Sequence, residues 1–144
     1  MSTGPTFAPP TVSTTLTRTL LDAAVAASRS HGQARTIAVV DNAGVLKGFV
    51  RMDGAALLTV QIAQDKASTA ASFGMASHQR HDVIKDDAPL ADGIVHTARL
   101  VVFGGCYPIT VDGAVVGGLG VSGGHYSDDM TIATAALTEA GYPA

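Results

Sequence analysis

The chain has 144 residues, a formal net charge of −3, 47% hydrophobic residues and only 15% charged residues. This length predicts about one domain with one hydrophobic core, and nine Lys and Arg residues against twelve Asp and Glu exclude a basic groove for nucleic acid. Globular proteins carry about 25% charged residues, so the shortage indicates that part of the surface is covered in a homo-oligomer.

Residues 1–13 predict an extended N-terminal arm, because Pro, Ser and Thr favour irregular or polyproline backbone. The remaining residues, 14–144, are expected to form a single domain. The arm has no apolar signal-peptide segment, and the sequence has no run of 18 apolar residues that could span a membrane. We therefore expect a cytoplasmic protein without a membrane partner.

The N-terminal third predicts a helix followed by a β-hairpin. Leu and Ala recur at helical spacing after Thr14 or Thr15, either of which can cap the helix. Residues 36–40 are apolar on both faces, as in a central strand, and residues 46–52 alternate like a half-buried strand. Residues 41–44 have turn chemistry, so the two strands are expected to pair.

The middle of the chain predicts a long helix and then a looser stretch. Asp53 is a good N-cap residue, and the helix that it opens is expected to run to about Phe73. Residues 86–89, Asp-Asp-Ala-Pro, interrupt a segment that holds short helical turns. Residues 100–103 are apolar and predict a third strand.

The C-terminal part predicts a second hairpin and a last helix. Asp112-Gly113 is the strongest hairpin signal in the chain, and it joins expected strands over residues 107–111 and 114–121. Residues 127–129 are expected to cap and charge the start of a helix that ends at Gly141. The five strands then form a mainly antiparallel sheet covered by helices.

Lys66 is unusual because it falls on the apolar side of its predicted helix, at about 100° per residue. Lysine is rarely buried without a partner, and desolvation lowers its basicity unless an anion compensates it. Two interpretations stay open. The amine is held in a structural ion pair or reaches solvent along its stem, or it faces a ligand and takes part in catalysis.

Arg51 and Asp53 lie two residues apart on a predicted strand, and therefore on one face. In one interpretation Asp53 caps the following helix and pairs with Arg51. In the other, Arg51 holds a ligand carboxylate through two parallel hydrogen bonds. The two interpretations are compatible, since a paired arginine still has spare donors.

Residues 104–124 contain eight glycines. Gly118 and Gly120 share a strand face with Ser122, and the missing side chains allow either a helix or a ligand to approach the backbone. The segment is not a P-loop, because no Gly-Lys-Ser/Thr follows, and it lacks the parallel βαβ unit of a dinucleotide site.

The histidines and the single cysteine are the remaining candidates. His78 and His81 share a helical face, but no third ligand is evident from the spacing, so no metal site is expected. His96 and His125 adjoin apolar or glycine-rich segments and are candidates to reach a pocket. Cys106 excludes an intrachain disulfide, because it is the only cysteine; it is either a core residue or, like Tyr107, a haem ligand type.

Taken in order, these segments resemble the GlcG/HbpS-like family of haem-degrading or haem-binding domains, over residues 14–141. The resemblance implies a profilin-like α/β (α+β) fold, in which helices lie on both faces of a five-stranded antiparallel sheet, and it implies homo-oligomers. The matching stretches are residues 37–41, 49–54, 63–67, 103–105 and 112–123.

The resemblance implies a small-molecule-binding protein, with haem or another tetrapyrrole held by apolar walls and an axial His, Tyr or Cys. The alternative is a cofactor-independent lyase or isomerase acting on a small carboxylate or an aromatic hydroxylamine. In that enzyme Arg51 binds the anion, and Lys66 or His125 moves protons. A third alternative is a non-catalytic accessory oligomer. The expected ligand contacts are Asp53, Phe73, His96, Gly104, Gly105, Tyr107, Gly120 and Ser122.

Overall fold

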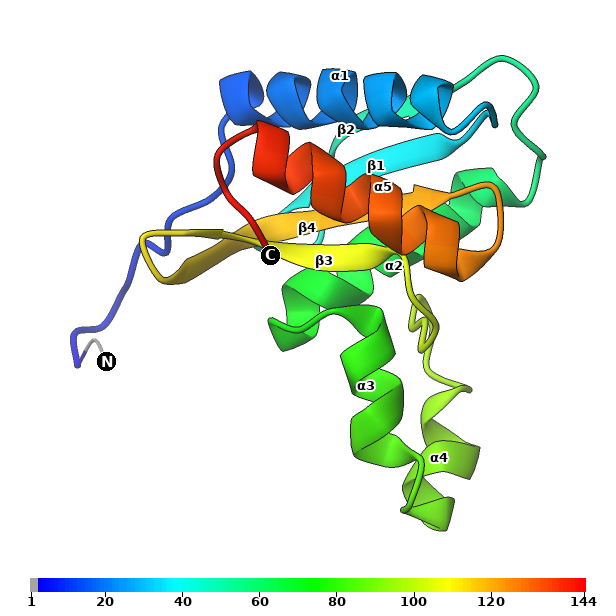
Figure 1. The fold of residues 1–144 in the computed structure, drawn as a ribbon. Coiled ribbons are helices and arrows are strands. Elements are labelled where there is room, and N and C mark those ends of the chain that lie inside the picture. Colours follow the sequence, from blue (N-terminus) through cyan, green and yellow to red (C-terminus); the bar gives the residue numbers. More distant parts are fainter. Residues whose placement is uncertain (1–2) are drawn as a thin grey trace.

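The computed structural model describes residues 3–144, in which an antiparallel sheet with the order β2-β1-β4-β3 lies between helices (Figure 1). The strands are β1 (Thr36–Asp41), β2 (Leu46–Arg51), β3 (Cys106–Val111) and β4 (Ala114–Ser122). The helices are α1 (Thr14–Ser30), α2 (Thr59–Phe73), α3 (Ser77–Ile84), α4 (Ala88–Ile94) and α5 (Tyr126–Glu139). The expected mixed α/β class with an antiparallel sheet is confirmed.

The strand register brings distant segments together at one end of the sheet. Thr36, at the start of β1, lies opposite Arg51 at the end of β2 and opposite Ser122 at the end of β4. The chain leaves β4 here and enters α5 directly. The segment before β1 and the start of α5 therefore lie close together at this end of the sheet.

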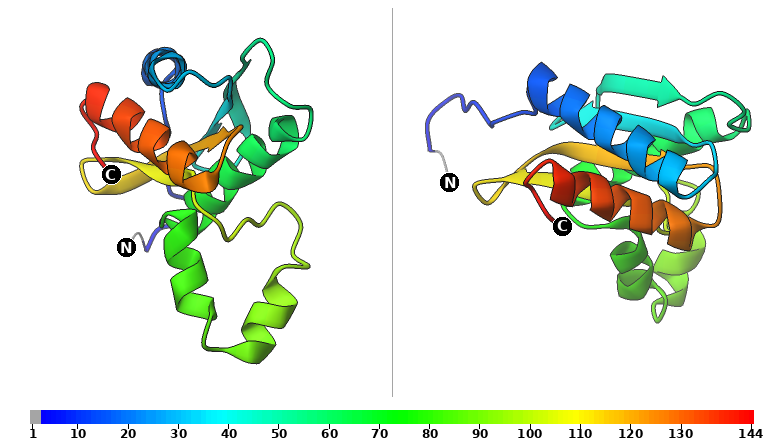
Figure 2. Two further views of the ribbon diagram at one scale, coloured as in Figure 1. Left: turned by 45° about the vertical axis from the view of Figure 1, so that its right-hand side comes forward. Right: turned by 45° about the horizontal axis from the view of Figure 1, so that its top comes forward.

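Helices cover both faces of the sheet, as the resemblance implied. Helices α1 and α5 lie side by side on one face, and α2 lies on the other (Figure 2). Ile37 and Val39 of β1 belong to the core beneath α1 and α5, whereas Ala38 and Val40 belong to a smaller core beneath α2. Because successive side chains of a strand point to opposite faces, this two-sided burial explains why β1 is apolar throughout.

The approach of α2 to β4 explains two of the glycines. A Cβ atom at Gly120 would overlap the carbonyl oxygen of Ala63, and one at Gly118 would overlap that of Ala67. The sequence left a helix and a ligand as alternatives at this face, and the structure shows the helix. The expected ligand contact of Gly120 is therefore replaced by a packing role.

The sheet has four strands rather than five, because residues 100–103 do not join it. The N–H of Val101 donates to the side-chain oxygen of Thr69, at 3.0 Å, and not to a strand. The backbone also turns at both ends of the segment, where Arg99 and Gly105 have φ angles of 63° and 115°. The apolar character of residues 100–103 thus predicted a strand wrongly.

Helix α2 begins at Thr59, later than predicted, and Asp53 does not cap it. Gly54 has a φ angle of 87°, outside the helical region, and the N–H of Ala55 closes a turn on the carbonyl of Met52. Asp53 is exposed in this turn. Helix α1 is capped one residue earlier than expected, by the hydroxyl of Ser13.

Residues 3–13 contain no helix or strand, and the first two residues of the predicted arm lie outside the described residues. Val12 is buried, and its N–H donates to the carbonyl of Val116, so the end of the arm is fixed to β4. Among the described residues, no helix combines the length and the apolar character needed to cross a membrane.

The contact between α2 and β4 predicts a strong effect of Gly120→Ala. The added methyl group meets backbone rather than a movable side chain, so we expect the variant to lose about 1–3 kcal/mol or more of unfolding free energy in urea. Gly93→Ala is the matched control, because a Cβ at Gly93 in α4 meets no atom within 4 Å and alanine favours a helix. Equal stabilities of the two variants would contradict this packing role.

Candidate functional site

Three ionised side chains form a buried cluster at the end of the sheet described above. The carboxylate of Asp129 on α5 accepts from Lys66 Nζ at 3.0 Å and from Arg35 Nε at 3.0 Å. Arg35 is 0% exposed, Lys66 1% and Asp129 2%. The ion-pair interpretation of Lys66 is therefore correct, and the cluster places two cations on one carboxylate.

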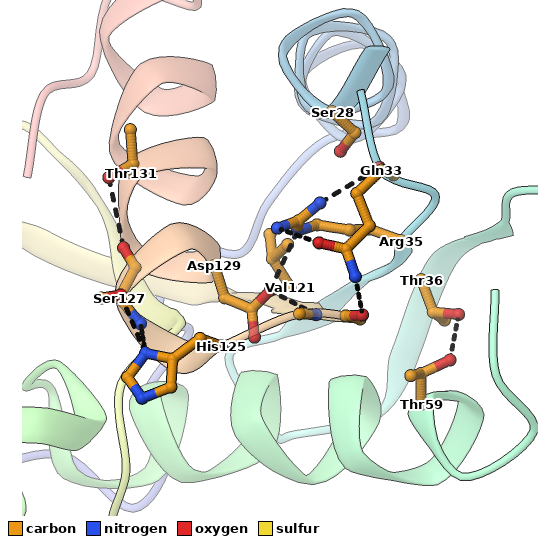
Figure 3. A network of polar contacts seen from close by, with 12 residues as sticks. Ser28, Gln33, Arg35, Thr36, Thr59, Val121, His125, Ser127, Asp129 and Thr131 are labelled. Atoms are coloured by element: carbon orange, nitrogen blue, oxygen red, sulfur yellow. Dashed lines mark hydrogen bonds and ion pairs between the residues drawn. The ribbon is translucent and has the colours of Figure 1, made fainter. Parts of the chain in front are cut away.

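Arg35 was not singled out from the sequence, and it completes the cluster from the segment before β1. Its two terminal nitrogens donate to the backbone and side-chain oxygens of Gln33, at 3.1 and 3.4 Å (Figure 3). The side chain of Gln33 in turn donates to the carbonyl of Gly123. These bonds engage both terminal nitrogens of the guanidinium, whose Nε atom donates to Asp129.

The environment of Lys66 changes its acidity. Burial lowers the pKa of Lys66 from its ordinary value of 10.5, while the attraction of Asp129 opposes this shift. The amine also donates to the carbonyl oxygen of Val121, at 2.8 Å, and lies 5.2 Å from the ring centre of Phe103. Lys66 is thus anchored by two acceptors and an aromatic face.

Gly105 makes room for this amine. A Cβ atom at Gly105 would lie 2.5 Å from Lys66 Nζ and 2.8 Å from Asp129 Cβ, and the φ angle of 115° also favours glycine. Gly105 was expected to contact a ligand. The structure instead places it behind the Lys66–Asp129 pair, where its missing side chain leaves space for that pair.

A hollow of about 350 Å³ opens over Lys66, and we call it the amine hollow. Its walls come from α2, the end of β4, the start of α5 and the segment before β3. Thr59, on the α2 wall, is fixed by a 2.7 Å hydrogen bond to Thr36 of β1 (Figure 3). The lining residues are Thr59, Ile62, Lys66, Phe103, Ser122, Gly123, Gly124, His125, Tyr126 and Asp129.

His125 caps α5 and has one ring nitrogen occupied. Its Nδ1 atom accepts from the backbone N–H of Ser127 at 3.2 Å and contacts the Ser127 hydroxyl at 2.8 Å (Figure 3). In the neutral ring this places the proton on Nε2, which is then a donor. The ring also lies against Tyr126, with 4.3 Å between ring centres.

A second hollow, of about 330 Å³, lies between α3 and α5, and we call it the aromatic hollow. Phe103 and Tyr126 line both hollows, and these two side chains are 43% and 46% exposed. The two spaces therefore meet along a pair of accessible aromatic rings. The lining residues are His78, His81, Asp82, Val102, Phe103, Gly104 and Tyr126.

The structure brings together some of the candidates from the sequence. Lys66, Ser122 and His125 line the amine hollow, and Gly104 lines the aromatic hollow. Tyr107 is buried and lines a different hollow, beside the ring of His78. The amine and the end of the glycine-rich segment thus border one space, which Arg51 does not reach.

Other candidates lie elsewhere. Arg51 is exposed and donates twice to the carbonyl of Ala55, at 3.1 and 2.9 Å, rather than pairing with Asp53. Phe73 lies beneath the guanidinium of Arg80, at 4.1 Å. His96 is exposed beyond the end of α4. None of these residues lines either of the two hollows.

Cys106 is fully buried, and burial raises the pKa of its thiol to about 11. A protonated, enclosed thiol is a poor metal ligand, so Cys106 does not fit the role of an axial haem ligand. Within residues 3–144, no group of three or more His, Cys, Asp or Glu side chains could hold a metal ion.

Comparison with known proteins identifies the family of this chain. The sequence model of a family described as "Haem degrading protein HbpS-like" matches residues 12–138. The chain belongs to this HbpS-like family. The crystal structure of a PduOC:haem complex has the same fold, with a TM-score of 0.83, 32% identity and coverage of 90% of this chain and 94% of that one.

Two relatives extend this comparison. The protein GlcG of Escherichia coli K12 is 32% identical over 111 residues, which are 74% of this chain and 81% of GlcG. The corrinoid adenosyltransferase PduO of Salmonella typhimurium LT2 is 37% identical over 102 residues, or 70% of this chain. The match spans only 30% of the adenosyltransferase. The GlcG/HbpS-like resemblance is thereby confirmed.

The shared carboxylate predicts a large effect of Asp129→Asn. The change leaves Lys66 and Arg35 buried without a counter-charge, so we expect a loss of about 3–5 kcal/mol of unfolding free energy. Asp128→Asn is the neighbouring control, because Asp128 is partly exposed; it should change stability by less than about 1 kcal/mol. Chemical unfolding measures both. Similar losses in the two variants would exclude a special role for Asp129.

The pH dependence of stability should also report Lys66. Between its lowered pKa and 10.5, the unfolded state holds more protons at this amine than the folded state. Stability from this group therefore rises with pH in that window, and below the window the full cost of burying the charge is present. We expect the unfolding free energy of the wild type, minus that of Lys66→Met, to increase as the pH rises toward 10.5. If the difference between the two unfolding free energies did not change with pH, the lowered pKa of Lys66 would be contradicted.

Proposed function

We propose that this chain binds haem or another flat tetrapyrrole at the aromatic hollow. The supporting observation is that two imidazoles, those of His78 and His81, line the same hollow as the exposed rings of Phe103 and Tyr126. A porphyrin needs apolar or aromatic surface against its faces and a nitrogen donor for its iron. Membership of the HbpS-like family and the PduOC:haem complex of a relative support the same ligand class.

The side chains of the hollow fit this group. Nδ1 of His78 is buried and has no hydrogen-bond partner among the described residues, so its donor or acceptor capacity is unused. His81 lies on the same helix and is exposed. His125 is a poorer axial candidate, because its neutral ring carries the proton on Nε2. Bound haem would supply an iron ion that takes small ligands or an electron.

Titration of the purified protein with haemin tests this proposal. We expect a shifted Soret band for the wild type, and loss or displacement of that band for His78→Ala or His81→Ala, because each change removes a candidate iron ligand. His96→Ala is the control, since His96 lines neither hollow. No Soret shift with the wild type, or equal spectra for all four proteins, would refute haem binding at this hollow.

A second candidate is a cofactor-independent lyase or isomerase acting on a small carboxylate or an aromatic hydroxylamine. The Lys66 amine lies 3.0 Å from the Asp129 carboxylate at a hollow that His125 also lines, and such a set can hold and move a proton. Arg51 has no part in this version, because it lines neither hollow. Turnover of such a compound by haem-free protein would distinguish this function from haem binding.

We also propose that the chain self-associates, as its low charge content predicted. Leu57 and Leu58, in the loop before α2, are 74% and 75% exposed. Adjacent exposed leucines are apolar surface of the kind that a second subunit covers. The cytoplasmic location remains a prediction from the sequence.

A further inference from the structure

We propose that the amine hollow is a carboxylate-binding site, in which a ligand carboxylate accepts hydrogen bonds from Lys66 Nζ and the Ser122 hydroxyl. The carboxylate belongs either to a porphyrin side chain or to a small organic acid. In the first case the inference rests on the haem proposal and deepens it. The site itself depends only on residues of the amine hollow.

The charge balance of the buried cluster points to an anion. When Lys66 is protonated, it and Arg35 carry two positive charges, and Asp129 supplies one negative charge. Both Asp129 oxygens are engaged: Oδ2 accepts from Lys66, and Oδ1 from Arg35 and from the N–H of Gly124. No other Asp or Glu lines the hollow. A second anion would therefore complete the compensation of two buried cations.

The donors for that anion are already in place. A protonated lysine has three N–H bonds, and Lys66 uses two of them on Val121 and Asp129. Ser122 follows Gly118 and Gly120 on the β4 face that packs against α2, so its side chain points to the α2 side. Ser122 is only 5% exposed, and it lines the amine hollow together with Lys66.

The apolar walls define the rest of the ligand. Ile62, Phe103 and Tyr126 surround the polar floor, so the carboxylate should be attached to an apolar or aromatic body. A volume of about 350 Å³ suits a small acid. The aromatic rings shared with the second hollow also allow a larger ligand to lie there and extend one carboxylate toward Lys66.

Calorimetric titration with sodium benzoate and with benzamide, which has nearly the same shape but no charge, tests the inference. We expect the wild type to bind benzoate about tenfold more tightly than benzamide or better, because only the carboxylate balances the buried charge. Lys66→Met should abolish this preference while leaving Arg35 and Asp129 as a neutral pair. Ser122→Ala should weaken benzoate binding about three- to tenfold.

Lys47→Met is the control for loss of a lysine, since Lys47 is exposed on β2 and outside the hollow; its benzoate affinity should equal that of the wild type. Thermal unfolding verifies that each variant is folded. The comparison of benzoate with benzamide in the wild type, and the Ser122→Ala variant, decide the matter if Lys66→Met does not fold. Equal binding of benzoate and benzamide, or no benzoate binding together with equal binding of protoporphyrin IX and its dimethyl ester, would overturn the inference.

Protoporphyrin IX and its dimethyl ester separate the two sources of the carboxylate. Weaker binding of the ester than of the free acid, with the difference lost in Lys66→Met, would assign the site to a porphyrin carboxylate. Selective benzoate binding without any porphyrin binding would remove the haem proposal and leave the carboxylate site. Porphyrin binding that is equal for acid and ester, without benzoate binding, would remove the carboxylate site and leave the haem proposal.

Discussion

The carboxylate of Asp129 joins three parts of the chain that are far apart in sequence. It accepts from Lys66 on α2 and from Arg35 before β1, and it lies in the first turn of α5, where the helix dipole favours a negative charge. Because all three side chains are almost fully buried, removing this carboxylate would leave two buried cations without a counter-charge. The carboxylate therefore ties α5, on one face of the sheet, to α2 on the other face. It also forms part of the lining of the amine hollow.

The absence of side chains is what allows these charges to meet. Gly118 and Gly120 let the backbone of α2 lie directly on β4, which brings Lys66 to the level of Val121 and Asp129. Gly105 then leaves space for the amine between the strand and α5. These three glycines therefore shape the site indirectly: the helix α2 and the side chain of Lys66 occupy the space that their side chains would fill.

The sequence predicted the class of fold and the buried lysine well, because both follow from periodicity. Helical spacing places Lys66 among apolar residues, and the structure buries it there. Arg35 could not be found in this way, since it precedes a strand and its partner lies on α5, far along the chain. The start of α2 and the strand expected at residues 100–103 were wrong because Gly54, Arg99 and Gly105 turn the backbone at positions that local composition does not reveal.

Helices α3 and α4 extend away from the sheet (Figures 1 and 2), and they contribute little to either core. Only Ser77 and Ile84 of α3 are buried, and no residue of α4 is. Such segments open locally at a low free-energy cost, independently of global unfolding. We therefore expect the wall of the aromatic hollow that carries His78 and His81 to open more readily than the rest of the domain, and a molecule bound there to increase its order.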